Sequence, residues 1–291
     1  MFQNIIKITI IAIILLIAGY VLIMYRNMKK LKGMKLAYPM KEKEEITVSK
    51  DLVYKIAGDR KLLMDVYIPV NRKDYEKLPV VIFNHGEGLE VFIKDAKDWG
   101  IFTSYGMLLA SKGYVAVTFN HRYASKNFMK IKEVAEDVKA AVSYVKKNSA
   151  TWNADIDNIF IWSFSLGGIY SSVFLRNDYH IKAVISYYGL LDLFTRIPKK
   201  LRKSLEEFTP DQYLRNITNT KILIVKAALD KVPGVNQSID NFIKAAEKYH
   251  IDYRYILHKS WGHSFDVFTD NEETTSVIDQ TISFIKQISK Q

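Results

Sequence analysis

From residue 46 onward, short apolar runs rich in β-branched residues alternate with longer segments whose apolar side chains recur every three or four positions. The short runs predict strands and the longer segments predict amphipathic helices. The predicted strands are Ile46–Val48 with Leu52–Ile56, Leu62–Tyr67, Val80–Asn84, Val115–Asn120, Ile159–Ser163, Ala183–Tyr187, Ile222–Ala227 and Tyr253–Leu257. The predicted helices are Phe102–Ser111, Ile131–Lys147, Leu166–Leu175, Ile239–Tyr249 and Thr274–Ile288. This alternation is typical of one α/β domain, expected over residues 46–291, in which helices cross over a mostly parallel sheet.

Two parts of the domain depart from the alternation. No helix separates the first predicted strands, so they are expected to pair antiparallel at one edge, and the parallel units begin near Val80. Residues 190–219 follow neither period and contain Pro198 and Pro210. We expect them to form a small cap-like insert that shapes a substrate pocket together with the loop after Gly86.

An uncharged stretch of 18 residues, Ile8–Tyr25, precedes the domain, with Lys7 before it and Arg26 after it. A helix of that length nearly crosses the hydrocarbon core of a bilayer, and the residues that follow make a poor signal-peptidase site. Residues 1–25 are therefore predicted to be a single-pass transmembrane anchor, with a cleaved signal peptide as the alternative. Residues 26–45 are predicted to be a basic juxtamembrane linker.

Basic residues are concentrated near this stretch. The formal net charge is +11, of which residues 1–45 carry +5. Because most of these charges follow the apolar stretch, the positive-inside rule places the domain in the cytoplasm, with an extracytoplasmic domain as the alternative. The rest of the chain lacks an Arg-rich stripe interleaved with aromatics, which argues against a nucleic-acid partner. The absence of cysteine excludes disulfides, zinc thiolate sites and a cysteine nucleophile.

A strand–turn–helix pattern surrounds a candidate nucleophile, Ser165. The predicted strand that ends at Ser163 runs into Phe164-Ser165-Leu166-Gly167-Gly168, and a predicted helix follows. A nucleophile at such a turn needs small residues two positions to either side, and the helix N-terminus stabilises negative charge. Ser165 has Ser163 and Gly167 at these positions, so the pattern is G-x-S-x-G with serine in place of the first glycine.

A serine nucleophile needs a base, and the base needs an acid that orients it. Of the six histidines, His263 is the candidate base because it follows a glycine in the loop between the last predicted strand and the C-terminal helix. Asp230, just after a predicted strand, is the candidate acid. Asp192 is the alternative acid, although a helix-capping role is favoured for it.

The oxyanion of an acyl-transfer reaction needs backbone amide donors. The amide of Leu166, where the predicted helix begins, is one candidate. The second is the amide of Glu87 or of Gly86, in the loop after the first strand of the parallel block.

These motifs together resemble the α/β-hydrolase superfamily, and most of all its dienelactone-hydrolase and bacterial esterase branches, the latter of the acetylxylan or feruloyl esterase type. The motifs that carry the resemblance are His85-Gly86-x-Gly88, Ser163-x-Ser165-x-Gly167-Gly168, Leu229-Asp230 with Val232-Pro233, and Gly262-His263-Ser264-Phe265-Asp266. The resemblance covers roughly Leu52–Ile288. It implies an eight-stranded, mostly parallel sheet with flanking helices, and cofactor-free hydrolysis of a small-molecule ester through an acyl-serine.

The sequence departs from the superfamily pattern at Ser163 and at Glu87, which stands where a second glycine is common. A Glu87 carboxylate facing the pocket would disfavour anionic substrates. A peptidase or an acyltransferase on the same triad, and a membrane-tethered binding protein without turnover, are the alternative functions. No cofactor or metal site is predicted, because acidic residues and histidines do not gather at ligand spacing and the P-loop lysine is missing.

Overall fold

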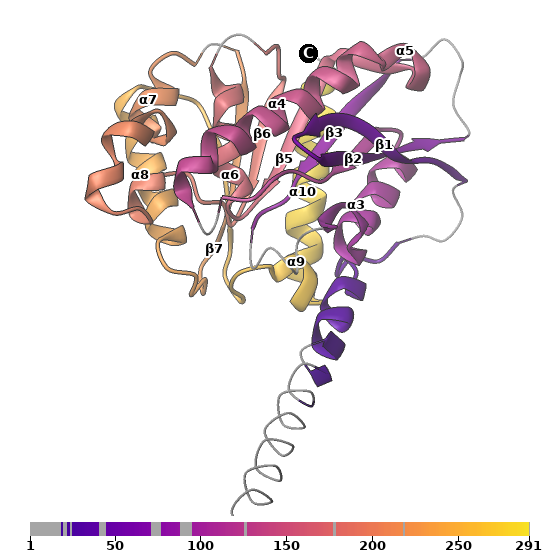
Figure 1. Ribbon diagram of the computed structural model, residues 1–291, viewed down its shortest axis with the longest axis horizontal. Coiled ribbons are helices and arrows are strands. Elements are labelled where there is room, and N and C mark those ends of the chain that lie inside the picture. Colours follow the sequence, from indigo (N-terminus) through magenta and orange to yellow (C-terminus); the bar gives the residue numbers. More distant parts are fainter. Residues whose placement is uncertain are drawn as a thin grey trace, which may run out of the picture.

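The computed structural model describes residues 19, 22–23, 25–40, 45–70, 77–87, 95–124, 127–176, 179–217 and 219–290. Their strands form one eight-stranded sheet in the order β1-β2-β4-β3-β5-β6-β7-β8 (Figure 1). The strands are β1 (Ile46–Ala57), β2 (Arg60–Pro69), β3 (Leu78–Asn84), β4 (Val115–Phe119), β5 (Ala154–Phe164), β6 (Ala183–Tyr187), β7 (Lys221–Ala227) and β8 (Arg254–His258). The pairs β1–β2 and β2–β4 are antiparallel and the others are parallel, which confirms the expected antiparallel edge.

Helices cover both faces of the sheet (Figure 1). They are α3 (Gly100–Ser111), α4 (Ile131–Lys147), α5 (Ser149–Trp152), α6 (Gly167–Ser171), α7 (Pro210–Leu214), α8 (Val235–Lys248), α9 (Phe265–Phe268) and α10 (Glu272–Ser289). Alternate strand residues bury on opposite faces: Val80 and Ile82 join the core under α4 and α8, whereas Val81 and Phe83 join the core under α3 and α10. The five predicted helices are all present, but Leu166–Leu175 divides into α6 and the 3₁₀ helix η3 (Ser172–Leu175).

The insert at residues 190–219 lies between β6 and β7. It consists of η4 (Leu193–Thr195), η5 (Lys199–Leu201), η6 (Lys203–Phe208) and α7. Its buried side chains, including Leu193, Leu205 and Phe208, belong to the core under α4 and α8. The insert therefore packs on that face of the sheet.

The N-terminal part of the described chain packs against the domain. Residues 25–33 are helical, and Figure 1 shows this helix in indigo beside α9 and the start of α3. Leu36 joins the core under α3 and α10, and the Ala37 amide donates a 2.7 Å hydrogen bond to the carbonyl oxygen of Asp266. The described part of the expected linker, 26–45, is thus folded onto the α/β domain.

Within the described residues, no helix is long and apolar enough to cross a membrane. The predicted span, Ile8–Tyr25, falls mostly outside those residues, since only Gly19, Leu22, Ile23 and Tyr25 of it are described. The predicted anchor therefore stays a prediction.

Among the described residues, the carboxylates of Asp51, Asp65 and Asp98 lie close enough to one another to hold a metal ion. The ammonium of Lys97 lies among them, with its Nζ atom 2.7 Å from Asp51, 2.9 Å from Asp65 and 2.7 Å from Asp98. A lysine side chain thus fills the centre of this cluster and neutralises part of its charge.

A buried ion pair ties the antiparallel edge to α4. The Asp137 carboxylate is fully buried and accepts hydrogen bonds from Lys55 Nζ at 2.7 Å and Arg122 Nε at 2.8 Å. Burial works against its ionised form, but the hydrogen bonds from Arg122 and Lys55 prevail and lower the pKa of Asp137. Arg122 and Asp137 thus form a structural ion pair.

We expect Asp137→Ala to lower the free energy of unfolding by about 3–5 kcal/mol, because it leaves two cations without their buried partner. Urea denaturation at neutral pH measures the change. Glu136→Ala is the matched control: Glu136 is an exposed acid on the same helix whose ion pair with Lys139 lies at the surface, and its loss should cost less than about 1 kcal/mol. Equal losses in the two variants would contradict the assignment.

Candidate active site

Ser165 stands at a sharp turn between β5 and α6. Its φ angle is +52°, a left-handed conformation that is costly for a residue with a side chain. Neighbouring glycines make room for the turn: a Cβ atom at Gly167 would lie 2.5 Å from the carbonyl oxygen of Asn84, and one at Gly86 would lie 2.7 Å from Ser165 Cβ. The strained turn lifts the serine hydroxyl out of the sheet at the carboxyl ends of the strands.

The structure brings the three predicted triad residues together. His263 Nε2 lies 3.0 Å from Ser165 Oγ, and His263 Nδ1 lies 2.7 Å from Asp230 Oδ2. The Nδ1–H group donates to the fully buried Asp230 carboxylate, which leaves the Nε2 lone pair facing the serine hydroxyl. This is the geometry a general base needs in order to take the hydroxyl proton.

The loops that hold the base and the acid fit against each other. A Cβ atom at Gly262 would lie 2.7 Å from the carbonyl oxygen of Leu229, so the glycine before His263 permits the close approach. The second oxygen of Asp230, Oδ1, accepts a 2.8 Å hydrogen bond from the Val232 amide. The carboxylate is thereby fixed toward His263.

The alternative acid, Asp192, has the capping role that the sequence favoured. It precedes η4, where Oδ1 accepts a 2.9 Å hydrogen bond from the Phe194 amide. Its Oδ2 accepts a 2.7 Å hydrogen bond from the side chain of Asn241 on α8. One carboxylate oxygen thus accepts a hydrogen bond from the insert, and the other accepts one from α8.

The two departures from the superfamily pattern have different surroundings. Ser163 is fully buried and lies in register between Asn84 on β3 and Ser186 on β6, so a small side chain replaces the glycine there. The Glu87 carboxylate accepts 2.9 Å hydrogen bonds from the Ala124 amide and a hydrogen bond from the Tyr170 hydroxyl. The Glu87 carboxylate therefore points toward the Ala124 amide and the Tyr170 hydroxyl.

A cavity of about 310 Å³ adjoins Ser165 and His263. Its other lining residues are Met28, Leu31, Lys32, Met34, His85, Gly86, Glu87, Ala96, Trp99, Ile101, Phe102, Phe164, Tyr188, Ser264, Val267 and Phe268. The expectation that the 190–219 insert shapes this pocket is wrong. The insert packs under α4 and α8, whereas Phe102, Phe164 and Tyr188 of the cavity belong to the core under α3 and α10.

Comparison with known proteins agrees with this architecture. The BD-FAE family model matches residues 64–228, more than half of the chain. The chain belongs to the BD-FAE family. BD-FAE is an esterase family of the α/β-hydrolase superfamily, so the superfamily expected from the motifs is confirmed, while the dienelactone-hydrolase branch stays a prediction.

Individual relatives of this BD-FAE protein are distant. The precursor of a medium-chain fatty acyl-CoA hydrolase from Anas platyrhynchos is 26% identical over 137 residues, which cover 44% of this chain and 22% of that protein. The chain spans about a quarter of the length of the curated relatives it matches.

Two solved esterases share the fold. The butyrate-bound esterase 2 of Thermogutta terrifontis has a TM-score of 0.64 at 18% identity and covers 85% of this chain and 96% of its own. Esterase B of Lactobacillus rhamnosis has a TM-score of 0.69 at 14% identity and covers 94% of this chain and 95% of its own.

Sequence reasoning gave Tyr188 and Asp266 no role in supporting the histidine of this BD-FAE site. The ring of Tyr188 lies 4.7 Å from the ring of His263, centroid to centroid, and its hydroxyl donates a 2.7 Å hydrogen bond to Asp266 Oδ1. The hydroxyl of Tyr105 donates to Asp266 Oδ2 at 2.8 Å. Tyr188 has a φ angle of +37°, and no sequence signal marks a tyrosine for such a bend.

Asp266 is a buried carboxyl beside the site. Burial raises its pKa to about 6, and the hydrogen bonds from Tyr188 and Tyr105 only partly oppose that rise. Since the unfolded chain releases this proton near its ordinary value of 3.8, the folded state binds the proton more tightly. Protonation of Asp266 therefore adds to the free energy of unfolding. This contribution is fully present below pH 3.8 and is lost as the pH rises through about 6.

We therefore expect the stability advantage of the wild type over Asp266→Asn to fall by about 3 kcal/mol as pH rises from about 4 to about 7. Denaturant unfolding of both proteins across this range measures the difference. Asp270→Asn, at an exposed position nearby, should keep the pH dependence of the wild type. A pH-independent difference for Asp266→Asn would refute the interpretation.

Proposed function

We propose that the protein is a serine hydrolase that cleaves carboxylic esters through an acyl-serine intermediate. Ser165 is the nucleophile, His263 the general base and acid, and Asp230 the residue that orients and stabilises the imidazole. The observation that carries this proposal is the pair of hydrogen bonds that links Ser165 Oγ to His263 Nε2 and His263 Nδ1 to Asp230 Oδ2 beside an apolar cavity.

Acylation begins when Ser165 Oγ attacks the ester carbonyl carbon and its proton passes to His263 Nε2. The carbonyl oxygen becomes an oxyanion, and the resulting imidazolium is stabilised by the Asp230 carboxylate. His263 then returns the proton to the leaving alkoxide as the carbon–oxygen bond breaks, and the alcohol departs. A water molecule repeats the sequence on the acyl-serine and releases the carboxylic acid.

The amide of Leu166 is our first oxyanion donor, and the amide of Gly86 or Glu87 the second. Leu166 directly precedes α6, so its amide points where the helix end favours negative charge. A Cβ atom at Gly86 would lie 3.3 Å from the Leu166 amide nitrogen, so the two candidate loops adjoin. The bonds that Glu87 makes to Ala124 and Tyr170 hold its carboxylate.

The comparisons support ester substrates over the alternatives. The family is an esterase family, and the relatives include a fatty acyl-CoA hydrolase, a lipase and a gut esterase by name. A peptidase or an acyltransferase would use the same three residues, and substrate tests separate these activities.

We expect Ser165→Ala and His263→Ala each to lower kcat for p-nitrophenyl acetate by about 10⁴-fold or more, and Asp230→Asn by about 10⁴-fold. Asp192→Asn is the matched control and should change kcat by less than about tenfold, because Asp192 caps a helix. Steady-state kinetics on the full chain measure all four variants.

Labelling with a fluorophosphonate probe distinguishes the alternatives. Labelling that disappears in Ser165→Ala, together with ester turnover, supports the esterase. Labelling without ester turnover indicates another acyl chemistry on an activated serine. A folded protein with neither property would be a binding protein, and the proposal would be rejected.

We also propose that residues 1–25 anchor the protein in a membrane with the hydrolase domain in the cytoplasm. The support is the uncharged stretch Ile8–Tyr25 and the basic residues that follow it.

A single introduced cysteine tests both parts, since the chain has none of its own. In Ser143→Cys, an exposed position on α4, a membrane-impermeant maleimide should label the protein only after the cells are opened, and the protein should sediment with membranes after alkaline extraction. Labelling of intact cells would place the domain outside, and release into the supernatant would refute the anchor.

A further inference from the structure

The segment just after the predicted anchor forms part of the cavity at the catalytic serine. Met28, Leu31, Lys32 and Met34 line that cavity together with residues of the hydrolase domain. The first three lie on the helix at residues 25–33, and Met34 follows its end. A segment expected to be a linker thus supplies a wall of the substrate site.

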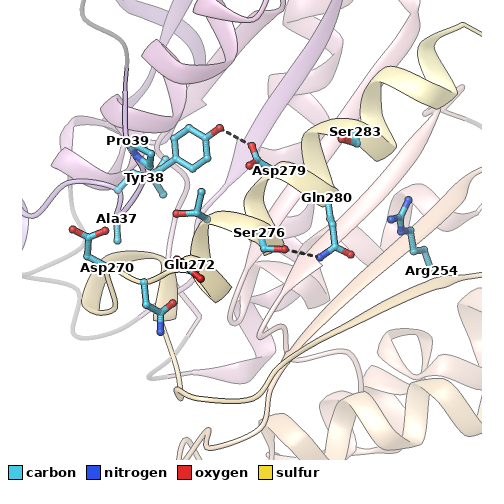
Figure 2. Close-up of a pocket in the computed structure, with 13 residues that line it drawn as sticks. Ala37, Tyr38, Pro39, Arg254, Asp270, Glu272, Ser276, Asp279, Gln280 and Ser283 are labelled. Atoms are coloured by element: carbon cyan, nitrogen blue, oxygen red, sulfur yellow. Dashed lines mark hydrogen bonds between the residues drawn. The ribbon is translucent and has the colours of Figure 1, made fainter.

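Several contacts hold this segment in place. The Tyr38 hydroxyl donates a 2.6 Å hydrogen bond to Asp279 on α10, which Figure 2 shows as a dashed line. The buried Leu36 and the hydrogen bond from the Ala37 amide to Asp266 fix the residues just before it.

The start of α3 is shaped to accept the segment. A Cβ atom at Gly100 would lie 2.5 Å from the carbonyl oxygen of Met34 and 2.8 Å from that of Gly33. Only glycine permits this approach, so the position of Met34 at the cavity depends on the packing between two backbones.

The chemistry of the cavity favours a hydrocarbon chain. The apolar and aromatic members of its lining are Met28, Leu31, Met34, Ala96, Trp99, Ile101, Phe102, Phe164, Tyr188, Val267 and Phe268. The two charged side chains in the lining already have partners. Lys32 forms an ion pair with Asp95 at 3.8 Å, and the Glu87 carboxylate accepts a hydrogen bond from the Ala124 amide. Because most of the lining offers no hydrogen-bond partner, a sugar or a peptide group would lose hydrogen bonds to water there, whereas methylene groups gain from leaving water.

The size of the cavity limits the length of the acyl chain that it can hold. Its volume of about 310 Å³ is roughly twice that of an apolar cavity of about 150 Å³ that accepts a benzene ring. It therefore has room for roughly a dozen non-hydrogen atoms, which is an ester group with a medium-length acyl chain.

We propose that Met28, Leu31 and Met34 complete an acyl-chain pocket and make the enzyme prefer esters of medium-length, unbranched aliphatic acids. The proposal rests on the serine esterase function proposed above. Ser165 and His263 are in contact with Gly86 and Tyr188, so an acetyl group meets those residues first. A longer chain reaches the wall formed by the N-terminal segment.

The test compares p-nitrophenyl octanoate with p-nitrophenyl acetate on the full chain. In the double variant Met28→Ser, Met34→Ser, kcat/KM for octanoate should fall by about tenfold or more, the loss of contact with roughly two methylene groups, and that for acetate should fall far less. Met40→Ser is the matched control, because Met40 is an exposed methionine of the same segment outside the cavity lining, and it should change either value by less than about twofold.

A second variant disturbs the wall from outside the cavity. Gly100→Ala should push the Met34 backbone away and reproduce the selective loss for octanoate, while melting temperatures verify that each variant is folded. Equal losses on both esters, or no loss on either, would overturn the proposal and leave the esterase function standing. A folded wild type that hydrolyses neither ester would instead overturn the esterase function, and the acyl pocket with it.

Discussion

The close approach of the β5–α6 turn to the loop after β3 is the constraint on which the rest of this site depends. At Gly167 and Gly86 the two backbones leave no space for a Cβ atom. That contact holds Ser165 at a φ angle of +52°, and the surrounding sheet offsets the strain. The strain is useful because it presents the hydroxyl to His263 with little further reorganisation.

His263 is positioned by contacts of a different kind. Gly262 lets its loop pack on Leu229, Asp230 bonds to the imidazole, and the ring of Tyr188 packs against it. Tyr188 is held by Asp266, whose backbone carbonyl also accepts the hydrogen bond from Ala37. One short stretch, His263 to Asp266, therefore connects the imidazole, the buried tyrosines Tyr105 and Tyr188, and the N-terminal segment.

Through these contacts the N-terminal segment has a role that its composition does not indicate. A basic, sparsely apolar stretch beside a predicted membrane anchor indicates a linker. In the folded protein the same stretch packs on α3, α9 and α10 and closes one side of an apolar cavity. If the anchor is present as proposed, the acyl pocket lies next to the membrane, where amphiphilic esters gather.

The sequence by itself determined the helices and strands and the order of the candidate triad residues along the chain. Strand and helix periods are local, so Ala183–Tyr187 and Ile131–Lys147 have the predicted bounds, and the small residues around Ser165 report a local steric need. Tertiary structure alone decided which face the 190–219 insert covers, that Tyr188 and Asp266 support His263, and that Met28 and Met34 reach the cavity. Each of these features depends on contacts between segments far apart in the chain, such as Tyr38 with Asp279. The local periodicity of a sequence cannot predict a contact between residues more than two hundred positions apart.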